Sequence, residues 1–332
     1  MAQPASLAEV WRGPFHESHH LGHAVICDGA GQILSAWGDP DAVVLPRSSS
    51  KMIQALPLLT SGAADARGLS TEQLALACAS HQGAPVHVAR VNAWLSDLGL
   101  DDAALRCGPQ VSRDTDLKLE MIRAHDAPCR VHNNCSGKHA GFLTLAQHLG
   151  AGPDYVDPEH PVQLACLDAF ETVTDQPSPG FGIDGCSAPN FASTMHGMAR
   201  AMGWFATAGQ RSDSLSTAAA RLVEAMHRHP ELVAGEGRAC TRLMRAAKEP
   251  VALKTGAEGY FIAILPMRGL GIALKAADGA TRAAECAITA LLVRLDVLDA
   301  ANPEVTAFLR PTIRNWDGLA TGEIRPAPGL LV

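Results

Sequence analysis

The sequence lacks the features that mark membrane, secreted and nucleic-acid-binding proteins. Acidic residues outnumber basic ones by 34 to 27, giving a net charge of −7, so no basic face is expected for nucleic acid or an anionic membrane. No stretch approaches the about 18 uninterrupted apolar residues of a membrane span. The N-terminal segment carries Glu9 and shows no signal-peptide apolar run. We therefore expect a cytoplasmic protein, for which a small zwitterionic partner is permitted.

Paired cysteine motifs are also missing. The nine cysteines are scattered along the chain and none forms a CxxC pair, so neither a zinc ribbon nor a thioredoxin-type site is indicated. An odd number of cysteines without a signal peptide fits a reducing cytosol. Most of them are expected to be small buried apolar side chains.

The patterns along the chain predict one two-lobed α/β (α+β) unit without repeats, low-complexity tracts or long polar linkers. An antiparallel sheet is built from both termini and flanked by helices, and a mostly helical lobe is inserted between them. The α/β lobe is expected over about residues 8–65 and 250–332, and the helical lobe over about residues 66–249. Strands are predicted at residues 20–27, 32–37, 251–255, 260–267 and 271–276, and helices at 71–80, 85–98, 116–124, 138–149, 161–172, 191–206, 215–229 and 282–298.

A serine and a lysine lie three residues apart at a predicted helix start, where Ser48 and Lys51 stand in the run PRSSSKM. On a helix this spacing puts both side chains on one face, with about 5–6 Å between the Cβ atoms. A neutral lysine could take the hydroxyl proton, and burial or a second cation favours neutrality. The same pattern also fits a capping serine, for which Ser49 or Ser50 is suitable, and a solvated lysine.

A second feature, Lys254-Thr255-Gly256, ends a predicted strand far along the chain. In penicillin-recognising serine hydrolases an SxxK motif comes first and a KTG motif follows on a strand beside the nucleophile. The strand lysine would be the second cation, and the glycine would leave room where substrate approaches. A lysine before an ordinary turn is the alternative. The SDN-type motif of β-lactamases is not evident, which weighs against a β-lactamase in particular.

Two polar turns precede predicted helices and contain the remaining candidate residues. The first is HNNCSGKHAG at residues 132–141, and the second is DGCSAPN at 184–190. Both also fit a turn with a helix cap. Cys135 and Cys186 could meet around a zinc ion, which thiolates suit. Alternatively, Cys135 is a nucleophile with His132 or His139 as its base, or the thiols are inert and buried.

The run HNNCSGKHAGFL, with PRSSSK, DGCSAPN and KTGAEGYF in the same order, resembles the L-asparaginase II family of the rhizobial, Ser–Lys type. The resemblance runs from about Val10 to the end of the chain, as a single catalytic domain. It implies a fold similar to serine β-lactamases and glutaminases, and hydrolysis of L-asparagine to L-aspartate and ammonia. It also implies a homodimer that holds Zn²⁺.

The resemblance further implies the residues of the site. Two Ser–Lys pairs are expected, which match Ser48–Lys51 and Ser80–Lys254, and substrate would meet Asp184. Because lysine must lose its proton to bind zinc, the metal should bind more weakly as pH falls. Ser50 and Met52 are small departures from the family pattern. The expected zinc ligands are Cys135, Lys138 and Cys186, and the expected substrate-binding residues are Arg47, Asp184, Glu258, His132 and Asn133.

The sequence thus predicts that Ser48 attacks the side-chain amide, with Lys51 as general base and Lys254 tuning it. Ser80 would relay protons, although the sequence leaves open which serine forms the ester. A glutaminase or a β-lactam-recognising hydrolase could use the same pair, because one methylene provides only about 1–3 kcal/mol of discrimination. A non-catalytic zinc- and amino-acid-binding protein is the rival of another class.

Overall fold

The computed structural model describes residues 3–331, which fold into two compact units. The first is a sheet unit made of the chain up to Ser49, the segment Ser193–Thr207 and the chain from Gly237 onward. The second is a helical unit made of Ser50–Ala192 and Ala208–Glu236. An antiparallel sheet unit and an inserted helical unit are the arrangement that the sequence predicts.

The boundaries differ from the expected lobes because a periodic pattern reveals a helix but not the layer on which it packs. Residues 50–65 form short helices that contact other helices of the helical unit. Segment Ser193–Thr207, expected in the helical lobe, instead packs on strands of the sheet unit. Residues 237–249 also belong to the sheet unit.

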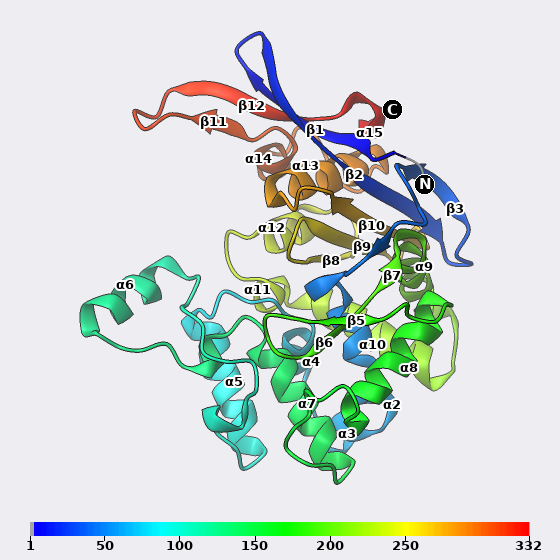
Figure 1. Ribbon diagram of the computed structural model, residues 1–332, viewed down its shortest axis with the longest axis vertical. Helices are drawn as coiled ribbons and strands as arrows, with labels where there is room; N and C mark the ends of the chain where they lie inside the picture. Colours follow the sequence, from blue (N-terminus) through cyan, green and yellow to red (C-terminus); the bar gives the residue numbers. More distant parts are fainter. Residues whose placement is uncertain (1–2, 332) are drawn as a thin grey trace. The chain divides into compact units, whose positions relative to one another are not determined.

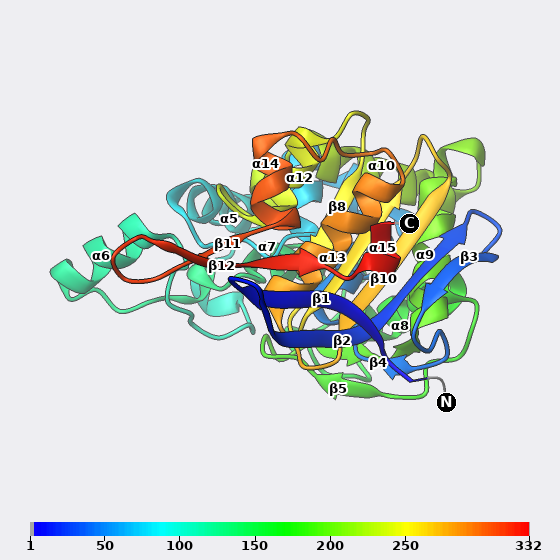
Figure 2. The same ribbon diagram turned by 90° about the horizontal axis from the view of Figure 1, so that it is seen from above.

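The sheet unit is organised by one eight-stranded antiparallel sheet with the order β11-β12-β1-β2-β10-β9-β8, in which β3 also pairs with β2. Figures 1 and 2 show the blue N-terminal strands beside the orange and red C-terminal ones. β1, β11 and β12 were not predicted, because they are largely half-exposed and carry many polar residues. The strands are β1 (Ala5–Arg12), β2 (Phe15–Asp28), β3 (Ile33–Trp37), β8 (Ala252–Thr255), β9 (Tyr260–Leu265), β10 (Leu270–Ala276), β11 (Thr312–Arg314) and β12 (Ala320–Pro326).

Helices cover the sheet closely. Every residue of β9 is buried, and both α9 and α13 contact β9 and β10. A Cβ added at Gly271 would lie 2.0 Å from the backbone nitrogen of Gly203, so α9 can rest on β10 only where both lack a side chain. The remaining elements of this unit are β4 (Val43–Val44), β7 (Ser193–Thr194), α9 (Met195–Ala206), α12 (Ala239–Ala246), α13 (Thr281–Arg294), α14 (Pro303–Leu309) and α15 (Pro328–Leu331).

The helical unit is arranged around α7, whose residues from Ser136 to Ala146 are all buried. A helix that is enclosed on all sides contacts several neighbours, here including α4, α5 and α8. The glycine of the HNNCSGKH run lies at the closest approach, because a Cβ added at Gly137 would lie 2.5 Å from the Leu76 carbonyl oxygen of α4. Gly137 therefore allows α4 and α7 to touch along their backbones.

Several helix ends differ from the sequence prediction. The helix expected over residues 71–80 ends at Ala77, and Ser70 caps its start through a capping box with Gln73. Ser50 precedes α1 without a side-chain capping bond. The expected helix over residues 191–206 begins only at Met195, because the preceding residues form short strands. The elements of the helical unit are α1 (Lys51–Gln54), α2 (Leu56–Thr60), α3 (Ala63–Ala66), α4 (Thr71–Ala77), α5 (Pro85–Asp97), α6 (Thr115–Ala124), α7 (Ser136–His148), α8 (Pro161–Thr174), β5 (Phe181–Ile183), β6 (Pro189–Phe191), α10 (Ser214–Arg228) and α11 (Pro230–Val233).

None of the helices within residues 3–331 is both long enough and apolar enough to cross a membrane.

Candidate active site

A buried lysine lies among the candidate catalytic groups of the helical unit. Lys51 is the first residue of α1, and its side chain is only 1% exposed. Its Nζ lies 3.0 Å from Ser80 Oγ and 3.1 Å from Cys135 Sγ, and it also donates to the Ala79 carbonyl. The lysine expected to pair with Ser48 therefore contacts the second candidate serine and a candidate zinc ligand.

Ser80 is held by backbone contacts just beyond the end of α4. Its own N–H donates to the Val233 carbonyl at 2.9 Å, and the next N–H, of His81, donates to the Asn134 carbonyl at 3.2 Å. The serine is fixed between α11 and the turn that carries Cys135 without using its hydroxyl. The segment that carries Ser80 lies outside any helix, so hydrogen bonds to distant parts of the chain order it.

The His81 ring strengthens the same connection, and its tautomer follows from its neighbours. The Gly83 N–H donates to His81 Nδ1 at 3.0 Å, so the ring proton must be on Nε2, which lies 3.0 Å from Ser136 Oγ. The Ser136 hydroxyl in turn donates to the Val131 carbonyl at 2.9 Å. This buried chain links the Ser80 segment to the N-terminus of α7.

The three expected zinc ligands gather in the helical unit. Cys135, Lys138 and Cys186 are each less than 5% exposed, and Lys138 Nζ lies 3.2 Å from Cys186 Sγ. A hydrogen bond from the Cys135 thiol, followed by the charge of Lys138, holds the pKa of Cys186 well below its usual range. Burial opposes the charge of Lys138, but the nearby Cys186 thiolate, together with Asp184, outweighs burial and raises the pKa of Lys138. The cluster therefore favours one thiolate beside one ammonium.

This donor set fits zinc in composition and spacing. Two thiols and an amine supply soft and borderline ligands, and 3.2 Å is close to the about 3.5 Å between neighbouring ligands of tetrahedral zinc. The Lys138 and Cys135 protons must leave when a metal binds. No group of three or more His, Cys, Asp or Glu side chains within residues 3–331 offers another such arrangement.

Cys135 is poorly suited to be the nucleophile. Its hydrogen bond with Cys186, together with burial, raises the pKa of its thiol well above the ordinary range. His132 Nδ1 instead accepts from the Cys129 N–H at 3.1 Å, and His139 Nδ1 lies 2.8 Å from the Tyr155 hydroxyl. The expected histidine bases therefore face other partners.

The turns around these ligands hold two of the expected substrate residues. The side-chain oxygen of Asn133 accepts from the Cys135 N–H at 2.9 Å, and its amide nitrogen donates to the Cys107 and Gly108 carbonyls. Both ends of this amide are thus used in shaping the turn. Asp184 begins a tight turn in which its carboxylate accepts from the Gly185 N–H at 2.7 Å.

In the sheet unit, the turn that carries Ser48 packs against the KTG motif. Ser49 Oγ donates to the Lys254 carbonyl at 3.0 Å, and Ser48 itself is half-buried. A Cβ added at Gly256 would lie 2.7 Å from the Pro46 carbonyl oxygen and 2.9 Å from Ser49 Oγ. The glycine therefore leaves room for the serine turn, whereas the sequence suggested that it left room for substrate. Lys254 is fully buried, and its Nζ donates to the Thr255 carbonyl at 2.7 Å.

Two expected substrate residues of the sheet unit have left-handed backbone conformations. Arg47 has φ of 52° and Glu258 has φ of 59°, a backbone region that residues other than glycine rarely adopt. Such strain gathers at functional sites, where it fixes the direction of a side chain. Burial lowers the pKa of Lys275, on which the Glu258 and Arg47 charges also act. Lys275 is thus a third charged residue of this group.

The L-asparaginase II family model matches residues 8–326, nearly the whole chain. The chain belongs to the L-asparaginase II family. No curated protein matches the chain.

Solved structures resemble this L-asparaginase II family member only distantly. Mglu, in its tris and glutamate form, is 15% identical with a TM-score of 0.46, covering 91% of this chain and 64% of that one. A Bacillus glutaminase is 14% identical with a TM-score of 0.44, covering 83% and 91%. A putative beta-lactamase from Bacteroides dorei DSM 17855 is 11% identical with a TM-score of 0.43, covering 77% and 84%.

Sequence reasoning missed several residues of the site. Lys275 carries no motif and meets Glu258 only because β10 pairs with β9. Tyr155, which lies against His139, is in an irregular segment that no pattern singles out. The side-chain oxygen of Gln110 accepts from the Asn134 N–H at 3.1 Å. Only the tertiary fold brings each of these residues to its partner, because the two are at least 16 residues apart in sequence.

Proposed function

We propose that this enzyme hydrolyses L-asparagine to L-aspartate and ammonia through a serine ester, with Lys51 as the proton acceptor. The observation that carries the proposal is the position of Lys51, whose buried Nζ lies 3.0 Å from Ser80 Oγ. A buried amine in hydrogen-bonding contact with a serine hydroxyl is the arrangement that activates a serine without a histidine. The family match supports an amide as the substrate.

Ser48 is our proposed nucleophile. It lies in a 3₁₀ turn (Arg47–Ser50) that leads directly into α1, three residues before Lys51, and it is half-buried. Its hydroxyl would attack the side-chain carbonyl and pass its proton to Lys51. The C–N bond would then break, and the nitrogen would leave as ammonia with that proton. Water would hydrolyse the aspartyl ester, while Ser80 relays protons through its contact with Lys51.

Substrate recognition is assigned to charged residues. Arg47 would bind the α-carboxylate, and Asp184 and Glu258 would bind the α-ammonium. Lys254 is assigned the role of the second cation. His132 and Asn133 are assigned to the wall of the site, since both are already bonded to protein groups.

We also propose a resident zinc ion at Cys135, Lys138 and Cys186. When bound, it would supply positive charge to polarise a carbonyl or to steady the wall. The protein residues would orient it and exclude water around it. A cytoplasmic homodimer, with a small molecule as its substrate, completes the proposal.

The proposal is tested by measuring ammonia released from L-asparagine and L-glutamine, and colour from a chromogenic cephalosporin. Asparagine should be the preferred substrate, and Ser48→Ala should abolish turnover. Preference for glutamine or the cephalosporin would replace the substrate assignment. Tight asparagine binding without ammonia would indicate a binding protein instead.

The nucleophile is identified by trapping the ester. After acid quenching during turnover, mass spectrometry should find the aspartyl adduct on the peptide that contains Ser48. An adduct on the Ser80 peptide, or near-wild-type turnover by Ser48→Ala when Ser80→Ala is inactive, would invert the assignment.

A further inference from the structure

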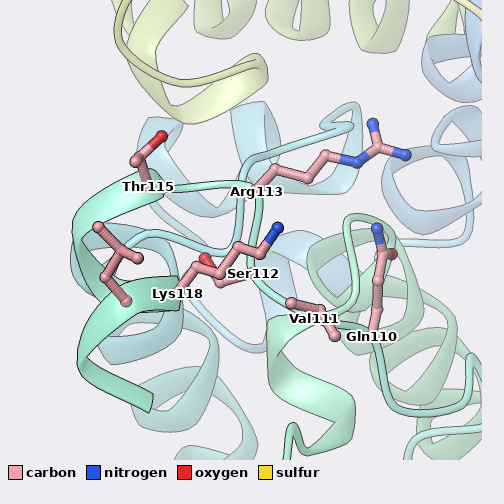
Figure 3. A pocket seen from close by; sticks show the side chains of 7 residues that line it. Gln110, Val111, Ser112, Arg113, Thr115 and Lys118 are labelled. Carbon is pink, nitrogen blue, oxygen red and sulfur yellow. The ribbon is translucent and has the colours of Figure 1, made fainter. Parts of the chain in front are cut away.

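A cavity of about 660 Å³ lies beside the site, entirely within the helical unit. It is formed by the loop that precedes α6 and by the first turns of that helix. Figure 3 shows the side chains of its labelled lining residues. The lining consists of Gln110, Val111, Ser112, Arg113, Thr115, Lys118 and Leu119. None of the functions proposed above uses this cavity.

The charge and hydrogen-bonding groups of the lining favour an anion. Arg113 and Lys118 are both cationic, and no carboxylate lines the cavity. Within residues 3–331 the Lys118 ammonium makes no hydrogen bond or ion pair. In Figure 3 the nitrogen ends of Lys118, Arg113 and Gln110 extend to the same side of the loop. Hydrogen bonds from cationic donors to a carboxylate or phosphate are stronger than neutral ones.

Gln110 contributes a donor whose orientation is fixed. The Asn134 N–H can only donate, so the Gln110 atom that faces it at 3.1 Å must be the carbonyl oxygen. The amide NH₂ is left for the cavity. The loop itself is anchored, because Ser112 Oγ donates to the Gly83 carbonyl at 3.0 Å and the Arg113 N–H donates to the Gln82 carbonyl at 2.7 Å.

The remaining lining residues favour an organic anion. Val111 is 49% exposed and Leu119 is 42% exposed, so two large apolar side chains face solvent at this cavity. A hydrocarbon segment could cover them and remove apolar surface from water. Inorganic phosphate offers charge without such a segment. A short dicarboxylate matches both the two cations and the apolar wall.

The cavity is connected to the proposed catalytic cluster by a short series of contacts. Gln110 binds the N–H of Asn134, and Asn134 Oδ1 lies 2.8 Å from Cys135 Sγ. Cys135 Sγ in turn lies 3.1 Å from Lys51 Nζ. A ligand that binds the Gln110 amide would therefore affect Asn134, which contacts Cys135.

We propose that this cavity is an accessory site for a small organic dicarboxylate, and that its occupancy lowers turnover through the Gln110–Asn134 contact. The ligand class is defined by two carboxylates on a short hydrocarbon chain. L-Aspartate, the product of the proposed reaction, belongs to this class, whereas zwitterionic asparagine does not. The effect on turnover rests on the proposed function, but binding does not.

Binding is tested by calorimetric titration of the full chain with succinate, with inorganic phosphate as the comparison, at matched ionic strength. Succinate should bind in the millimolar range or tighter and phosphate more weakly. Lys118→Gln should weaken succinate binding by roughly tenfold, because one charge-assisted contact is lost. Arg123→Gln removes a charge from an exposed position on the same helix outside the cavity, and it should bind as wild type.

Kinetics test the coupling separately. Succinate should lower kcat for asparagine without raising KM, and Lys118→Gln should lose this inhibition. Succinate binding that is absent, or unchanged in Lys118→Gln, or weakened equally in Arg123→Gln, would overturn the site. Purely competitive inhibition that persists in Lys118→Gln would place succinate in the substrate site. If no amide is hydrolysed, the proposed function fails while the titration still decides whether the cavity binds.

Discussion

Lys51 Nζ lies 3.0 Å from Ser80 Oγ, although the sequence paired this lysine with Ser48. The same Nζ also lies 3.1 Å from Cys135 Sγ, so one buried amine joins a candidate catalytic serine to a candidate zinc ligand. Chemistry at the serine and the state of the thiol cluster are therefore coupled through a single side chain.

Replacing Lys51 with methionine should lower kcat for asparagine by about 10²–10⁴-fold, the usual contribution of a general base. Methionine keeps the apolar stem but cannot accept a proton. The measurement is steady-state ammonia release, with circular dichroism to check folding. Lys118→Met, which removes an exposed amine outside the proposed catalytic cluster, is the matched control and should keep kcat without succinate. Activity within a few-fold of wild type in Lys51→Met would eliminate Lys51 as the base.

Removing Cys186 should remove zinc. Cys186→Ser is expected to lower the metal content measured by inductively coupled plasma mass spectrometry, because a hydroxyl is a poorer zinc ligand than a thiolate. Occupancy of the wild type should fall as pH falls, since the ligands must be deprotonated. Cys166→Ser changes another buried thiol of the helical unit and should retain the metal. Unchanged activity after chelation with confirmed metal loss would limit any ion to a structural role.

The His81 ring should position Ser80 rather than take part in the reaction. His81→Phe keeps a planar ring but breaks the bonds to Gly83 N–H and Ser136 Oγ. We expect kcat to fall by roughly tenfold or more with KM little changed, because a small misplacement of a reacting group slows the chemical step. His81→Asn, which retains a donor and an acceptor, should recover part of the loss. Equal losses in both variants would contradict the positioning role.

Gly137 should be intolerant of any side chain. A Cβ there would lie 2.5 Å from the Leu76 carbonyl oxygen, and a backbone atom in the core cannot move aside easily. Gly137→Ala should reduce the free energy of unfolding by roughly 1–3 kcal/mol, the usual range for overpacking. Urea titration measures the effect. Gly209→Ala, where an added Cβ meets nothing within 4 Å, is the matched control and should be nearly neutral.

Acid should destabilise the protein partly through His87. Burial lowers the pKa of this histidine below its ordinary value of 6.5, and the charge of Arg90 lowers it further. The hydrogen bond to the Glu231 carbonyl and the charges of Asp114 and Glu231 act in the opposite direction. Stability from the neutral ring is therefore fully present above pH 6.5 and lost as pH falls through the lower folded-state pKa.

His87→Gln should flatten this dependence by at most about 1.4 kcal/mol per pH unit. The measurement is urea unfolding at a series of pH values from neutrality downward. His125→Gln changes an exposed histidine of the same unit and serves as the control. An unchanged slope in His87→Gln would show that burial does not shift the titration of this ring.

The sequence was sufficient for the family, the mixed architecture and the strands of the inner sheet. Strands such as β9 and β10 are runs of apolar residues bounded by turns, and such runs can be recognised in the sequence because they must be buried. The resemblance carried by the HNNCSGKH run predicted that Cys135, Lys138 and Cys186 come together, and Lys138 Nζ lies 3.2 Å from Cys186 Sγ. The strands β1 and β12 were not predicted, because they contain polar residues and their stability depends on pairing with each other across the sheet.

Which polar groups meet was decided by the tertiary structure. Residue types and spacing predicted Ser48, Lys51 and Cys135 as candidates, but they could not place Lys51 against Ser80 or reveal the fixed orientation of Gln110. A hydrogen bond depends on fractions of an ångström and on the packing of distant segments, whereas a sequence pattern records only which faces are buried. The sequence therefore determined the chemical groups of this protein, and the fold alone decided their partners.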